Sequence, residues 1–86
     1  MIQIKYAFVV KAPGYSRGRQ SVQMESPQFF SEFVGVADCD EAIIAIENLV
    51  LNGTQVIELC GGFSAQETTK LRSRFSGIDI GHVTYS

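Results

Sequence analysis

The chain of 86 residues has little of what marks several specialised protein classes. Its two cysteines, Cys39 and Cys60, are too few for a disulfide scaffold, and no secretory signal precedes them. No apolar run approaches the length of a membrane span, and a net charge of -2 leaves no basic patch for nucleic acid. We therefore expect a cytoplasmic protein with reduced cysteines and without a membrane or nucleic-acid partner.

Familiar site motifs are also missing. The Gly61-Gly62 pair is not followed by the Gly-Lys-Ser/Thr of a Walker loop, and the third glycine of a dinucleotide fingerprint is absent. No arginine follows Cys60 at the spacing found in phosphatases. Without a Cys-x-x-Cys or His-x-x-x-His pair we expect no metal site, and no cofactor is identified.

Length and composition predict one globular domain over residues 1–86, since 45% of the residues are hydrophobic and the chain is too short for two cores. Alternating apolar residues predict strands at 2–11, 29–36 and 78–85, and a weaker edge strand at 20–25. A near-continuous apolar run predicts a central strand at 56–60. The segment 15–28 has no clear pattern, and the sequence does not specify its structure.

Capping residues predict two helices. Asp38 and Glu41 open a helix that runs to about residue 52, and Gly53 suits the position after its end. Ser64 and Glu67 form a capping box for a second helix that ends near residue 75. The second helix has only a narrow apolar stripe and should lie on the surface, with cationic residues toward its end.

The alternation of strands and helices in the second half predicts an α/β fold, with a four- to five-stranded, mainly parallel sheet and two crossover helices. If the strands lie in sequence order, both helices cover one face. The other face, with Val9, Val56, Cys60 or the residues that share their face, would stay bare. We therefore expect a homo-oligomer that packs sheet on sheet or extends the sheet. A reversed strand order, with one helix on each face and a monomer, is the alternative.

Residues 54–67, a strand followed by a double-glycine turn and a capped helix start, suggest a binding site. Ligands of parallel α/β sheets lie beyond the carboxyl ends of the strands, and free N–H groups at a helix N-terminus bind phosphate or carboxylate. The expected ligand-binding residues are those of the turn and two loop arginines that would close over the anion: Gly61, Gly62, Phe63, Ser64, Arg17 and Arg19. Alternatively, the glycines only allow a sharp turn, and the arginine loop is solvated.

A catalytic set is the second hypothesis for the same region. Cys60 beside a helix N-terminus would have a lowered pKa, Glu58 would act as an acid or base, and His82 would orient them if the last two strands are neighbours. Each residue also has a structural explanation. A buried cysteine is a small hydrophobe, a lone histidine is often structural, and Glu58 would pair with Lys11 or an arginine or contact another subunit.

Beyond these patterns, the chain resembles a family of small uncharacterised α/β proteins, a domain of unknown function of roughly this length. The matching segments are Ala12-Pro13-Gly14, Val34-Gly35-Val36, Ile57-Glu58-Leu59-Cys60-Gly61-Gly62-Phe63 and Gly81-His82-Val83. The resemblance implies a compact α/β domain with a shared glycine-cysteine turn, and it implies no activity or cofactor.

The function expected from the sequence is therefore an oligomeric binding module for a small anionic metabolite at the glycine turn. One alternative is a small enzyme that uses Cys60 with Glu58 and His82. The other is a structural or regulatory subunit, whose partner would dock on Ile44 and Leu51 at the outer side of the first helix.

Overall fold

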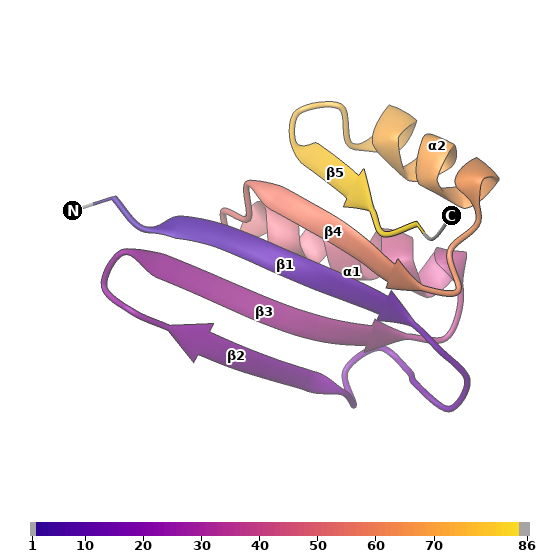
Figure 1. Ribbon diagram of the computed structural model, residues 1–86, viewed down its shortest axis with the longest axis horizontal. Coiled ribbons are helices and arrows are strands. Elements are labelled where there is room, and N and C mark those ends of the chain that lie inside the picture. Colours follow the sequence, from indigo (N-terminus) through magenta and orange to yellow (C-terminus); the bar gives the residue numbers. More distant parts are fainter. Residues whose placement is uncertain (1, 85–86) are drawn as a thin grey trace.

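The computed structural model describes residues 2–84 as five strands and two helices (Figure 1). In chain order these are β1 (Ile4–Lys11), β2 (Ser21–Glu25), β3 (Phe29–Val36), α1 (Cys39–Leu51), β4 (Val56–Gly61), α2 (Ala65–Arg74) and β5 (Asp79–His82). The predicted α/β fold with a mainly parallel sheet is confirmed.

The strands form one sheet in the order β2-β3-β1-β4-β5, in which only β2 and β3 are antiparallel (Figure 1). Because β1 lies between β3 and β4, the α1 connection passes over β1. The α2 connection advances in the same direction, so right-handed crossovers place both helices on one face. Ile46 of α1 and Leu71 of α2 belong to the same buried core. The alternative with a helix on each face is therefore wrong.

Strand register separates the two faces of the sheet. Ala7 pairs with Ile57 and Val9 with Leu59, and all four side chains are fully buried beneath the helices. Val9 thus lies in the core, whereas Val56 and Cys60 lie on the other side. We call that other side the open face, and it comprises Ile4, Tyr6, Phe8, Val10, Val22, Met24, Phe29, Ser31, Phe33, Gly35, Val56, Glu58, Cys60, Asp79 and Gly81.

The open face is apolar and largely uncovered within residues 2–84. Only Ser31 and Gly35 of its members are buried. Aromatic rings lie side by side along it, with Phe8 stacked on Phe33 at 4.6 Å between ring centroids. Such an exposed apolar surface is typical of an interaction site.

Two elements differ from the sequence prediction or extend it. The last strand ends at His82 instead of reaching Tyr85, and residues 85–86 lie outside the described part of the chain. Its pairing with β4 ends at Leu59 and His82, and the N–H of Val83 makes one further bond to the carbonyl of Leu59 at 3.0 Å. The weak edge strand is present as β2, and all five of its residues are exposed.

The outer side of α1 is exposed, as its pattern suggested. Ile44 is 42% exposed and Leu51 is 83% exposed, so α2 does not cover them. Within residues 2–84, neither helix is long and apolar enough to cross a membrane.

Candidate functional site

The glycine turn after β4 is shaped by the chain's own backbone. Gly61 has a left-handed φ of +80°, and a Cβ there would collide with the carbonyl oxygen of Lys11. Gly62 has no such φ, and a Cβ there would lie 3.6 Å from the same oxygen, an ordinary contact. The N–H of Gly62 donates to that oxygen at 2.9 Å. The turn therefore requires glycine at position 61 but not at position 62.

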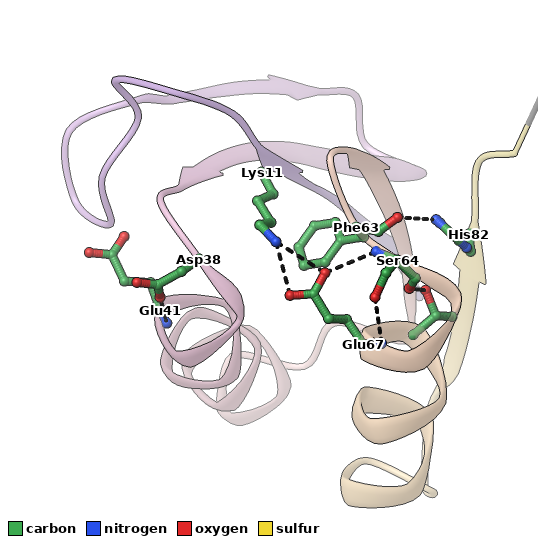
Figure 2. Close-up of polar contacts among 8 residues, drawn as sticks. Lys11, Asp38, Glu41, Phe63, Ser64, Glu67 and His82 are labelled. Atoms are coloured by element: carbon green, nitrogen blue, oxygen red, sulfur yellow. Dashed lines mark hydrogen bonds and ion pairs between the residues drawn. The ribbon is translucent and has the colours of Figure 1, made fainter.

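A carboxylate of the chain itself occupies the N-terminus of α2. The N–H of Ser64 donates to Glu67 Oε1 at 2.9 Å, and the N–H of Glu67 donates to Ser64 Oγ at 3.1 Å (Figure 2). This is the capping box that the sequence predicts. Lys11 Nζ lies 3.0 and 2.9 Å from the two carboxylate oxygens of Glu67. The same nitrogen is 5.8 Å from the ring centre of Phe63.

These contacts keep Glu67 ionised. The backbone N–H of Ser64 and the ammonium of Lys11 lower the pKa of the Glu67 carboxyl below its ordinary value. Glu67 thus supplies the negative charge that a helix N-terminus stabilises. An external anion at residues 61–64 stays a prediction, and to use the Ser64 N–H it would have to displace this internal carboxylate.

The two arginines expected to close over the turn line different hollows, neither of which includes residues 61–64. Arg17 lies beside α1, where its N–H donates to Glu41 Oε1 at 2.8 Å. Arg19 lines a hollow on the open face, together with Val10 and Phe33. The structure therefore brings Arg17 and Arg19 to opposite sides of the sheet rather than together over one anion.

The three residues of the catalytic hypothesis are not assembled. Cys60 and Glu58 share the open face, but His82 pairs with Leu59 and lies on the helix side. His82 Nε2 is 3.0 Å from the carbonyl oxygen of Phe63, beside the α2 N-terminus (Figure 2). The Glu58 side chain extends over Gly81, where a Cβ would collide with its Oε1. Glu58 is thus held near Cys60 and away from His82.

Neither cysteine has the electrostatics of an activated thiol. Burial raises the pKa of Cys60, and the carboxylate of Glu58 raises it further. Burial and the carboxylate of Glu67 raise the pKa of Cys39, the larger effect being burial. Both thiols are therefore protonated at neutral pH, whereas a nucleophilic cysteine needs its thiolate.

The acidic start of α1 acts in helix capping. Asp38 Oδ1 accepts the N–H of Glu41 at 2.9 Å, while Glu41 Oε1 accepts the N–H groups of Ala37 and Arg17 (Figure 2 labels Asp38 and Glu41). Within residues 2–84, no group of three or more histidine, cysteine or acidic side chains is arranged to hold a metal ion.

Comparison with known proteins identifies the family of the chain. The model of DUF6506, a family of unknown function, matches residues 4–86. The chain belongs to this family. No curated protein and no solved structure matches it. Membership of DUF6506 confirms the resemblance to a family of uncharacterised proteins, and it assigns no activity to the site residues.

Sequence reasoning missed two contacts that organise this DUF6506 chain. The Lys11–Glu67 ion pair joins residues 56 positions apart, which only the pairing of β1 with β4 brings together. Tyr15 packs on Gly35, where a Cβ would lie 2.7 Å from the ring. A glycine inside a strand often marks such a close approach, so Gly35 carried a usable signal.

Proposed function

We propose that this DUF6506 protein is a self-associating module in which the open faces of two copies pack against each other. The observation that carries the proposal is the apolar open face, which both helices leave bare. Its large apolar side chains include Phe29, Ile4, Val22 and Met24, which are 39%, 46%, 58% and 60% exposed. A solvated sheet face normally alternates polar residues with the buried ones of the opposite face.

The size of the open face suits a dimer. Five strands of four to eight residues, about 4.8 Å apart and rising about 3.3 Å per residue, give a face of roughly 500 Å². Packing two such faces buries roughly 1,000 Å² in total, which is the lower limit for a specific interface. Sheets pack face to face in this way in sandwich folds, about 10 Å apart.

Charge also favours a second copy. Glu58 and Asp79 are the only charged members of the open face, and both lie on its β4–β5 side. The strand residues of β2, β3 and β1 on this face are uncharged, and Arg19 of the preceding loop lies at one end of it. Two copies related by a two-fold axis present this same uncharged surface to each other. Because both cysteines are free thiols, we propose a reducing compartment, the cytoplasm, for the module.

Sedimentation equilibrium tests the proposal through the native mass. We expect the wild-type protein to sediment at twice the mass of the 9.5-kDa chain. The double variant Ile4→Lys, Met24→Lys should sediment as a monomer, because each lysine places a charge in the interface. Both positions are well exposed in a single copy, so these substitutions should leave its fold intact.

Matched substitutions on α1 provide the control. Ile44→Lys with Leu51→Lys changes two exposed apolar residues on the opposite side of the molecule, and the dimer should persist. A wild-type monomer at the highest soluble concentration would refute self-association. Dissociation by the α1 variant instead would place the interface on the helices. Strong hydrogen-exchange protection of β2 edge amides, with no effect of the face variant, would indicate sheet extension.

A further inference from the structure

The segment between β1 and β2 is a folded loop that stands at one end of the open face. The N–H of Tyr15 donates to the carbonyl of Ala12, and the N–H of Ser16 donates to Gln20 Oε1 at 2.9 Å. The N–H of Gly35 in turn donates to the carbonyl of Gln20 at 2.8 Å, which ties the loop to β3. These hydrogen bonds thus hold the loop in a defined position beside the sheet.

The side chain of Tyr15 packs the loop against the surface of the sheet. Its ring contacts Gly35, which pairs with Val10 and so belongs to the open face. A Cβ at Gly35 would lie 2.7 Å from the Tyr15 ring and 2.9 Å from Gln20 Cβ, so only glycine lets the loop approach this closely. Because Gly35 has no side chain, the ring of Tyr15 can pack directly on the backbone of β3.

A hollow of about 460 Å³ lies between the loop and the open face. Val10, Val22 and Phe33 provide apolar lining, and Tyr15 adds an aromatic ring. Arg19 is the only charged residue that lines the hollow. This volume falls within the range of small-molecule sites, which combine apolar walls with a few polar groups.

Arg19 is available to a ligand. Neither of the two ion pairs within residues 2–84 includes it. A guanidinium binds a carboxylate through two parallel hydrogen bonds, and planar apolar groups pack well against aromatic rings. We propose that this hollow binds a small aromatic monocarboxylate, with its ring between Tyr15 and Phe33 and its carboxylate on Arg19. This ligand site is a proposal separate from self-association, although Val10, Val22 and Phe33 of its lining also belong to the open face.

A titration followed by ¹H–¹⁵N NMR and calorimetry tests the site, with benzoate, phenylacetate and 1-naphthoate as probes. At least one probe should bind saturably and shift the amide signals of Gln20 and Gly35. Benzyl alcohol, which lacks the carboxylate, should bind about 10- to 100-fold more weakly, the factor for a hydrogen bond to a charged group. Arg19→Gln should weaken carboxylate binding by a similar factor.

Arg17→Gln is the matched control, because Arg17 lies in the same loop but lines the hollow beside α1, and it should leave the affinity unchanged. The titration is repeated with the Ile4→Lys, Met24→Lys variant, so that binding and self-association are judged separately. The proposal is overturned if no probe shifts these amides in either protein. Equal binding by Arg19→Gln, or equal binding of inorganic phosphate, would overturn it as well.

Discussion

Alanine substitution of the two glycines in the turn separates a backbone requirement from a ligand requirement. Both residues follow β4, and the sequence alone gives them the same candidate roles. The structure distinguishes them, because Gly61 has a φ of +80° and a Cβ there would collide with the Lys11 carbonyl, whereas a Cβ at Gly62 would make only an ordinary contact with it. We expect Gly61→Ala to destabilise the protein strongly and Gly62→Ala to change its stability little.

The size of the Gly61→Ala effect follows from three contributions. A left-handed conformation costs a residue with a Cβ roughly 1–2 kcal/mol. Relieving the contact between that Cβ and the Lys11 carbonyl costs about 1–3 kcal/mol, as for other overpacked sites. The smaller conformational entropy of the unfolded chain returns about 0.4–1 kcal/mol. The net loss is about 1–5 kcal/mol, and its midpoint of about 3 kcal/mol lowers the melting temperature by roughly 12–24 °C in a domain of this size.

Thermal and urea unfolding followed by circular dichroism measure both variants. For Gly62→Ala we expect a change within about 0.5 kcal/mol, since its Cβ makes only an ordinary contact. A matching native far-UV spectrum shows that each variant retains its fold. Equal, small effects of the two substitutions would refute the backbone explanation. Ligand binding would then be needed to explain why glycine occupies both positions.

Two other predictions concern titratable groups. Because the folded-state pKa of Glu67 lies below its ordinary value near 4.5, its contribution to stability is present above that pH and disappears as the pH falls through the folded-state pKa. Glu67→Gln should therefore lower the free energy of unfolding at neutral pH by about 1 kcal/mol, measured by urea unfolding. In acid the variant and the wild type should be equally stable. A difference that stays constant with pH would contradict this prediction. The pH profile of the Cys60 alkylation rate should have its inflection above the ordinary thiol pKa, and Glu58→Gln should lower the pKa of Cys60 but not that of Cys39. A wild-type Cys60 inflection below the ordinary thiol value, measured by mass spectrometry against pH, would restore the activated-thiol hypothesis.

The fold could be predicted from the sequence because most of its signals are local. Apolar alternation indicates the strands, and the Ser64–Glu67 capping box marks the start of α2. The loop 12–20 could not be predicted, since side chain–backbone contacts such as that between Gln20 and Ser16 hold it and leave no periodic pattern. The last strand is shorter than its alternation predicts, because apolar alternation continues past His82 whereas the pairing with β4 ends there.

The candidate site was predicted less well, for a geometric reason. Alternation shows which residues of one strand share a face, but it does not show which faces of two strands coincide. Glu58 and Cys60 were therefore placed together correctly, while the position of His82 depended on its pairing with Leu59. The Lys11–Glu67 ion pair was missed for the same reason, because it needs the register of β1 against β4.

The distribution of residues along β1 is the strongest argument for the proposal that a second copy covers the open face. Its helix side holds Ala7 and Val9, small enough to let the helix layer approach, and both lysines of the strand. Lys5 Nζ donates to the Asn52 carbonyl at the end of α1 at 2.8 Å, and Lys11 pairs with Glu67 at the start of α2. The open side of the strand has only apolar or aromatic residues, namely Ile4, Tyr6, Phe8 and Val10. Polar groups thus anchor the helices beneath the sheet, while the solvent side has none of the charges that would keep a monomer's surface hydrated. This arrangement suits a second apolar layer, which the open face of another copy would supply in the proposed dimer.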